Sequence, residues 1–413
     1  MIKELRRQFN NWFSQAKFDA YAHEMHTDYN WKVGFRLAET PVFLPPRLVG
    51  DILTASETIV DFLVNHDIKS ITQPAIENEF NVPNEDQHTM FLAMDFGICE
   101  DENGNIVPKL IELQGFPSLY NYMVQIGETW RRHFPLPENY GYLLTDKGLD
   151  YYLARLKRAI FNGHEPKHVV LLEIEPEKQS TSIDFYVAEK EFGIKVLCLS
   201  KVILEDRKLY YLENGEKVRI RRIYNRVIFD ELKQRPDLER QFNLTEDVDV
   251  EWAGHPNWFA RISKFLMPYL PSSEFIPEAR LLSSFKVLPE DLENYVLKPL
   301  FSFSGSGVVV DVSPEDIASI PENDQHLFML QRKVNYAPLI ETTVGDGEKA
   351  KIEFRSLYLW QEDEPRPEPM IHLLRMSKGK LIGVKYNKDK TWVGSSVAYF
   401  DLEKAKNQAR SSS

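Results

Sequence analysis

The chain contains 413 residues, of which 43% are hydrophobic and 27% charged, and its formal net charge is −12. A chain of this length is too long to fold around a single hydrophobic core, so we expect two or three closely packed globular domains. The excess of acidic residues excludes a basic surface for nucleic acid that extends over the whole chain. Two distant cysteines, an N-terminus without the apolar core of a signal peptide, and no ~20-residue apolar run favour a cytoplasmic protein without a membrane partner.

The first third of the chain begins with helical spacing and continues with a hairpin. Residues 1–30 predict one or two helices, which the prolines of PVFLPP (41–46) should end, and 55–66 predicts another helix with Ser56 or Thr58 as its cap. FLAMDFGI (91–98) and KLIELQG (109–115) then read as two strands. The DENGN sequence between them has the Asn-Gly chemistry of a tight turn, and a helix should follow Pro117.

The middle of the chain alternates helices and strands. An amphipathic helix is predicted over 144–163, a buried strand over 168–176, a helix over 181–194 and a strand over 195–200. This order indicates a small parallel α/β unit. A hairpin around Asn214-Gly215 and a strand leading into a helix follow, and the run 258–270 is predicted to be helical up to Pro268.

The last third differs, because strand-like runs dominate it. Six such runs occur between residues 296 and 387, namely VLKPL, GVVVDV, HLFMLQRKV, KIEFRSLYLW, PMIHLLRMS and GKLIGVKYN. They predict one large antiparallel sheet. The expected domains are 1–145, a helical region with the hairpin; 146–250, a small α/β unit; and 251–413, a nucleotide-binding portion.

Lys298 stands at the end of a predicted strand, directly before SFSGSG (302–307). Glycine-rich loops can direct several backbone N–H groups at an anion, and a lysine beside them suits a phosphate. The alternatives are a strand-end lysine reaching for solvent and an ordinary hairpin turn. The chain contains no Walker or complete Rossmann motif.

Two carboxylates and an amide are expected to meet on the 91–115 hairpin. Alternation places Glu112 and Gln114 on one face of their strand, and pairing across the turn brings Asp95 near Glu112. Such oxygen ligands suit Mg²⁺ carried on a nucleotide phosphate. The alternative is an outward polar face of a hairpin, although Glu112 and Gln114 stand between apolar residues.

These motifs resemble a known family. VLKPLFSFSGSGV (296–308) is similar to the strand and glycine-rich flap of ATP-grasp ligases, and MDFG with KLIELQGFPS is similar to the metal-ligand hairpin of the circularly permuted ATP-grasp proteins typified by glutathionylspermidine synthase. In that group the metal ligands precede the nucleotide lysines, as they do here. The resemblance implies an ATP-grasp-like fold of mixed α/β and α+β character in permuted order, comprising a small parallel unit and a large C-terminal antiparallel sheet.

The resemblance also implies roles for particular residues. Asp95, Glu112 and Gln114 would ligate Mg²⁺, with Gln114 where the family has asparagine, and Lys264 and Lys298 would be the two nucleotide lysines. The flap and the adenine-binding hinge would supply Ser304, Gly305, Ser306, Gly307, Gln331 and Lys333. Where the family flap carries an Arg-Glu pair, this chain has Phe303-Ser304.

Three arginines are candidates for contacting substrate or phosphate. Arg226, in RIRRIYNRVIFDEL, could hold a substrate carboxylate, and Arg355 and Arg375 could face the triphosphate or an acyl phosphate, because the guanidinium fork suits such groups. Structural salt bridges are the alternative for all three. Asn387 reads as a turn residue.

The resemblance implies an ATP- and Mg²⁺-dependent carboxylate–amine ligase acting through an acyl phosphate on small-molecule substrates. The altered flap and Gln114 keep open a catalytically inactive nucleotide-binding protein, and a phosphotransferase that stops at a phosphorylated product is a third interpretation. The acid, the amine and the oligomeric state are not indicated by the sequence.

Overall fold

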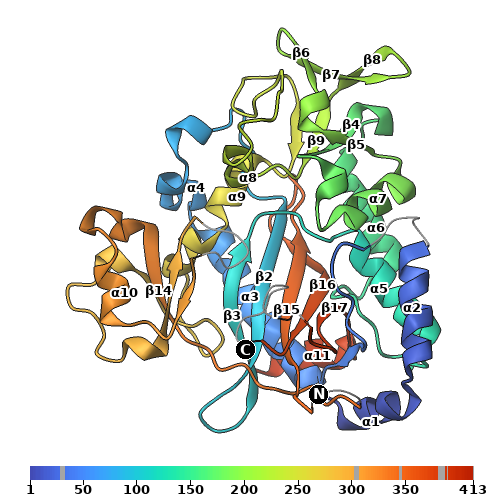
Figure 1. Cartoon of the computed structure of the whole chain (residues 1–413), viewed down its shortest axis with the longest axis vertical. Helices are drawn as coiled ribbons and strands as arrows, with labels where there is room; N and C mark the ends of the chain where they lie inside the picture. The colour runs from blue at the N-terminus through green and yellow to red at the C-terminus, as the bar shows by residue number, and fades with distance from the viewer. Residues whose placement is uncertain (28–32, 302–306, 344–346, 380–386, 388, 413) are drawn as a thin grey trace.

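A computed structural model describes residues 1–27, 33–301, 307–343, 347–379, 387 and 389–412 (Figure 1). Its centre is an antiparallel sheet in the order β17-β16-β15-β2-β3. The strands of this sheet are β2 (Phe91–Glu100), β3 (Ile106–Gln114), β15 (Lys351–Leu359), β16 (Glu368–Ser377) and β17 (Gly394–Ser396). Two distant parts of the chain therefore build one sheet, and the predicted hairpin of β2 and β3 is confirmed.

The central sheet is covered on both faces, because successive side chains of its strands point alternately into two hydrophobic cores. Leu92, Met94 and Phe96 of β2 point to a core shared with α3 and α11, whereas Phe91 and Ala93 point to a core shared with α5 and α6. Figure 1 shows α3 and α11 together behind the sheet. The covering helices are α3 (Pro46–Asn65), α5 (Tyr122–His133), α6 (Leu149–Phe161) and α11 (Leu402–Ser412).

The predicted parallel α/β unit is confirmed as a sheet in the order β10-β9-β4-β5, in which every pairing is parallel. Its elements are β4 (Val169–Glu173), α7 (Ser182–Phe192), β5 (Lys195–Cys198), β9 (Arg222–Asn225) and β10 (Glu251–Ala253). An appended sheet contains β6 (Ile203–Glu205), β7 (Lys208–Glu213) and β8 (Glu216–Ile220). Asn214 and Gly215 both have positive φ in the β7–β8 turn, as its chemistry predicts.

The prediction of one large antiparallel sheet in the last third is wrong. The strands divide between the central sheet and a separate sheet in the order β11-β14-β12-β13. That sheet comprises β11 (Ala279–Leu281), β12 (Tyr295–Pro299), β13 (Val309–Val310) and β14 (Phe328–Arg332), with α10 (Pro314–Ala318) beside it. The division follows from burial, because the short strands pack a small core of their own while β15 pairs on both sides and is buried along nearly its whole length. Of GKLIGVKYN, residues 380–386 lie outside the described residues.

Two predicted helix boundaries are also wrong. PVFLPP does lie between helices, as predicted, but the next helix, α3, begins at Pro46 and not at residue 55, because the N–H that proline lacks would be unpaired in the first helical turn. Ser56 is therefore a buried mid-helix residue and not a cap, and Thr58 donates a hydrogen bond back to the Thr54 carbonyl. The remaining short elements are α1 (Lys3–Trp12), α2 (Gln15–Thr27), β1 (Val42–Phe43), α4 (Ile68–Ile71), α8 (Phe229–Lys233), α9 (Pro256–Arg261) and β18 (Ala398–Tyr399).

The helix predicted over 258–270 is interrupted in its middle. α9 ends at Arg261, and a 3₁₀ turn, Lys264–Tyr269, begins where the Ser263 hydroxyl accepts from the Phe265 N–H at 3.2 Å. The break is where the chain meets the end of β3, because the Gly115 N–H donates to the Ile262 carbonyl at 2.8 Å. A side chain at Gly115 would approach the Trp258 carbonyl oxygen to 2.5 Å. This contact brings the 3₁₀ turn beside β3.

None of the helices in the described residues combines the length and the apolar character that crossing a membrane requires.

Candidate functional site

A row of charged side chains crosses one face of the central sheet. Arg355 of β15 lies opposite Asp95 of β2, and Asp95 lies opposite Glu112 of β3. Directly paired residues of antiparallel strands point to the same face, so the three side chains form a line across adjacent strands. The expected proximity of Asp95 to Glu112 is therefore present in the strand register.

Asp95 is buried and is paired with two arginines. Arg355 reaches both carboxylate oxygens, with its Nη2 at 2.6 Å from Oδ2, and the Arg375 Nη2 lies 2.9 Å from the same oxygen. Burial alone would raise the pKa of Asp95, but the guanidinium groups of Arg355 and Arg375 outweigh it and lower the pKa below its ordinary value. Asp95 is thus held as a carboxylate inside the protein.

A second buried carboxylate, that of Glu353, lies on β15 two residues before Arg355. Glu353 is opposite Arg375 in the β15–β16 register and forms an ion pair with it, and it accepts a hydrogen bond from the Tyr336 hydroxyl at 2.9 Å. Tyr336 packs over Gly97 of β2, where an added Cβ would lie 2.7 Å from its ring. Burial raises the pKa of Glu353 in spite of Arg375.

Lys298 reaches the same region from β12 through a bulge in β3. Asp95 pairs with Glu112 and Phe96 pairs with Leu110, so Ile111 is the extra residue on the bulged strand, β3. The Lys298 Nζ donates to the Ile111 carbonyl at 2.9 Å and to the Gln331 Oε1 at 2.6 Å. The bulge therefore supplies an acceptor that joins the small sheet to the central one.

Both predicted nucleotide lysines are buried near the acidic residues. Lys298 is 7% exposed and Lys264 is 4% exposed, and the Lys264 Nζ lies 3.3 Å from the Glu112 Oε1. Burial lowers the pKa of Lys298 to about 8, and Glu112 opposes this effect. Two lysines from beyond residue 260 thus lie with the acidic side chains of the first third.

We call this set the charged cluster. It contains three carboxylates and four cations, namely Asp95, Glu112, Glu353, Arg355, Arg375, Lys264 and Lys298. When all seven side chains are ionised, the charged cluster carries one excess positive charge.

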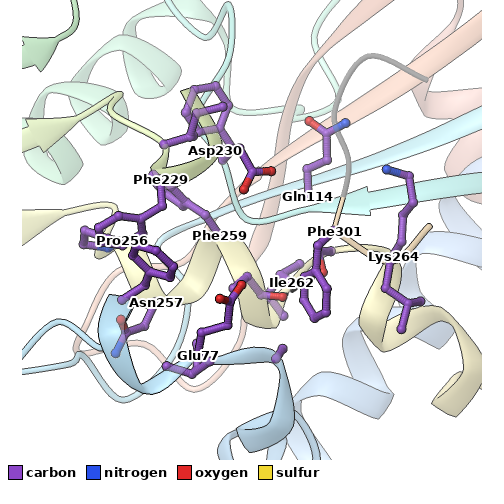
Figure 2. Close-up of a pocket in the computed structure, with 18 of the residues that line it drawn as sticks. Glu77, Gln114, Phe229, Asp230, Pro256, Asn257, Phe259, Ile262, Lys264 and Phe301 are labelled. Carbon is purple, nitrogen blue, oxygen red and sulfur yellow. Dashed lines mark hydrogen bonds between the residues drawn. The ribbon is translucent and has the colours of Figure 1, made fainter. Parts of the chain in front are cut away.

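A pocket adjoins the charged cluster on the side of β3 (Figure 2). It begins at Glu112 and Gln114, passes the broken helix at Lys264, and extends to α8. Chain segments 75–80, 112–116, 227–233, 256–264 and 300–301 all contribute to its wall. The pocket lies beyond the carboxyl end of β9, which is where open parallel sheets commonly hold ligands.

Several other predicted site residues lie apart from this arrangement or outside what is described. Residues 302–306, which include Ser304, Gly305 and Ser306, lie outside the described residues, while Gly307 is described, has a φ of +70° and is exposed. Lys333 forms an ion pair with Asp311, and its backbone N–H donates to the Asn294 carbonyl at 2.9 Å. The side chain of Gln331, proposed for adenine, contacts Lys298 and the Leu110 carbonyl.

Arg226 is buried behind the pocket wall. Its guanidinium lies over the ring of Phe116, 4.2 Å from the centroid, and its Nε is 4.0 Å from the Glu173 Oε2. Burial raises the pKa of Glu173 to about 8, which Arg226 opposes. Phe116 lines the pocket, so it stands between Arg226 and that space.

The residues expected to hold Mg²⁺ fit that ion only in part. Glu112 and Gln114 place oxygen atoms at the pocket, whereas both oxygens of Asp95 accept from arginines. In the parts of the chain that the structure describes, no group of three or more His, Cys, Asp or Glu side chains is arranged to hold a metal ion. The bonds from Arg355 and Arg375 occupy three of the roughly four lone-pair sites of Asp95, so only its Oδ1 retains a site for a metal.

Sequence reasoning overlooked Glu353, Tyr336 and the acidic residue Asp230 in the pocket wall. Glu353 stands two residues before Arg355, so strand alternation placed it on the same face as that candidate. No pattern in the sequence indicated that Tyr336 would cover Gly97, because that contact joins a loop to a distant strand.

The class of fold is a mixed α/β one, with an antiparallel central sheet, a small parallel unit and a separate antiparallel sheet. A solved structure of a glutathione synthetase-like effector from Globodera pallida, in its apo form, is similar to it with a TM-score of 0.53. The match covers 94% of this chain and 96% of that chain at 10% sequence identity, so the likeness shows a shared fold alone. No protein-family model matches the chain, and no curated protein matches its sequence.

Proposed function

We propose that the protein is an ATP-dependent carboxylate–amine ligase with a circularly permuted ATP-grasp-like fold. The observation that carries this proposal is the meeting of Lys264 and Lys298 with Asp95 and Glu112 beside a pocket. The excess positive charge of the charged cluster suits a polyanion such as a triphosphate. A fold shared with a glutathione synthetase-like protein also supports it.

In the proposed reaction, an oxygen of the substrate carboxylate attacks the γ-phosphorus of ATP. The bond from that phosphorus to the β–γ bridging oxygen breaks, and ADP leaves. The amine nitrogen then attacks the acyl carbon, phosphate departs with the acyl C–O bond pair, and the nitrogen loses a proton to give the amide. Such chemistry depends on positioning and charge neutralisation more than on a protein nucleophile.

The roles of the chain's own residues follow from their placement. Lys264 and Lys298 would neutralise phosphate oxygens, and Arg375, which is one-third exposed, could extend this toward the transferred group. Glu112 and Gln114 would contact the magnesium ion that accompanies ATP as part of the substrate. Arg355 donates to both oxygens of Asp95 and would orient that carboxylate.

The experiment is isothermal titration with a non-hydrolysable ATP analogue and Mg²⁺. Lys298→Met should weaken binding about 10- to 100-fold, because a charge-assisted hydrogen bond contributes about 1.5–3 kcal/mol. Lys349→Met is the matched control, since this exposed lysine pairs only with Glu341 in the described structure. Wild-type affinity in Lys298→Met would contradict the phosphate role.

A second candidate is a nucleotide-binding protein without catalysis. The observation that favours it is the pairing of both Asp95 oxygens with arginines, which leaves one of the three expected metal ligands with little capacity for a metal ion. ADP and amide formation, measured with mixed carboxylic acids and amines, distinguishes the two. Amide formation supports the ligase, tight nucleotide binding without turnover supports the second candidate, and ADP with a phosphorylated product but no amide indicates phosphotransfer.

A further inference from the structure

The wall of the pocket beside the charged cluster is mostly apolar. It contains five phenylalanines, namely Phe80, Phe116, Phe229, Phe259 and Phe301. Phe80 and Phe229 contact one another with their ring centroids 4.9 Å apart, and Phe116 and Phe259 meet edge to face at 5.1 Å. These rings come from distant segments of the chain, so the fold assembles an aromatic lining there.

The charged groups of the pocket pair with one another except for one. Lys264 pairs with Glu112, and the Lys233 Nζ lies 3.4 Å from the Glu77 Oε1. Asp230 is half-buried, and within the described chain its side chain has neither a salt bridge nor a hydrogen bond. Figure 2 shows the Asp230 carboxylate and the Gln114 amide on the same side of the pocket.

We propose that this pocket binds a primary amine with an aromatic body, whose ammonium group pairs with Asp230 and whose ring lies among Phe116, Phe229 and Phe259. The inference rests on the proposed function, because it names the class of the amine that the ligase would use. Asp230 and Lys264 line the same pocket, so an amine held by Asp230 lies in the space that adjoins Lys264, one of the two lysines proposed to bind phosphate.

Charge and desolvation both select this ligand class. The faces of aromatic rings attract cations, so the phenylalanines and Asp230 favour the same sign of charge. A carboxylate ligand would meet the three acidic side chains of the pocket, two of which already use its lysines. A short diamine would bring a second ammonium into the pocket, where the acids other than Asp230 are already paired with lysines, so this second charge would lose its hydration without gaining an unpaired partner. Burial raises the pKa of Asp230, and a bound cation would relieve that cost.

The test is direct binding without nucleotide, so that its outcome is separate from that of the ligase proposal. Isothermal titration at pH 7.5 compares 2-phenylethylamine with 2-phenylethanol, 3-phenylpropionate and 1,4-diaminobutane. We expect 2-phenylethylamine to bind at least tenfold more tightly than each of the others. Equal binding of 2-phenylethanol or tighter binding of 1,4-diaminobutane would overturn the inference.

Variants assign the binding to the pocket. Asp230→Asn should weaken 2-phenylethylamine at least tenfold while leaving 2-phenylethanol unchanged, because it removes charge and keeps shape. Glu239→Gln, at an exposed acid of the same segment, is the matched control and should bind as the wild type does. Fluorine NMR of 4-fluorophenylethylamine gives a second readout, in which Phe229→Ser should reduce line broadening. Unchanged affinity in Asp230→Asn would refute the proposal even if Lys298→Met shows that ATP binds as proposed.

Discussion

Replacing Asp95 by asparagine tests whether this carboxylate is held chiefly as the counter-ion of two arginines. Asparagine keeps the shape and one acceptor, but it leaves Arg355 and Arg375 in the interior with one carboxylate fewer. Breaking a buried ion pair from one side costs about 3–5 kcal/mol, and the retained acceptor and Glu353 favour the lower end. We therefore expect a loss of about 3 kcal/mol in the free energy of unfolding.

Urea denaturation at pH 7, followed by circular dichroism, measures this loss. Asp61→Asn is the control, because Asp61 pairs with Arg366 at 3.1 Å on the surface and should change stability by no more than about 0.5 kcal/mol. The double variant Asp95→Leu, Arg355→Met should recover most of the loss, since Arg375 keeps Glu353 and no unpaired charge stays buried.

The pH dependence has a definite sign. The pKa of Asp95 is lowered in the folded protein, so its contribution is complete above the unfolded pKa of about 3.9 and is lost as pH falls through the folded value. The difference between wild type and Asp95→Asn should therefore be constant from pH 5 to 7 and shrink below about pH 4. A loss under about 1 kcal/mol at pH 7 would refute the counter-ion account and favour Asp95 as a ligand awaiting a metal.

Three other outcomes are expected. Lys298 has a folded pKa of about 8 against about 10.4 unfolded, so the cost of burying its charge is full well below pH 8 and is relieved as pH rises toward 10. Between pH 8 and pH 10 the wild type should gain roughly 2 kcal/mol relative to Lys298→Met in urea denaturation. Burial lowers the pKa of His372 to about 3, and its ¹⁵N NMR shifts should stay those of a neutral imidazole at pH 5. Gly115→Ala should lower the free energy of unfolding by about 1–3 kcal/mol, because its Cβ would meet the Trp258 carbonyl; an unchanged melting temperature would contradict the close contact.

The hairpin was predictable because its signals are local. Alternation and an Asn-Gly turn fix the pairing of the two strands, and this pairing brings Asp95 opposite Glu112. The bulge at Ile111 was not predictable from the local pattern, because the carbonyl that it exposes accepts from Lys298, which belongs to another sheet. Alternation also does not distinguish a lysine that points to solvent from one buried against a bulge.

The other differences arise where distant segments decide the local structure. Residues 258–270 have helical spacing, but the contact at Gly115 and the cap at Ser263 break the helix and bring Lys264 to Glu112. Strand runs in the last third have the same pattern whichever sheet they join, so the sequence does not distinguish one sheet from two. Asp230 could not be identified as a candidate site residue from the sequence, because only the folded chain places it in the pocket wall.

The central sheet combines strands from distant parts of the chain, and this determines which parts of the protein can fold first during synthesis. Arg355 is 260 residues beyond Asp95, so at about 5–20 residues per second the ribosome delivers it roughly 10–50 s later. Until then β2 has an open edge and Asp95 lacks its arginine partners, whereas the parallel unit has all its strands once Ala253 has emerged. A nascent chain arrested near residue 330 should thus protect β4 and β9 from proteolysis while leaving β2 open to cleavage.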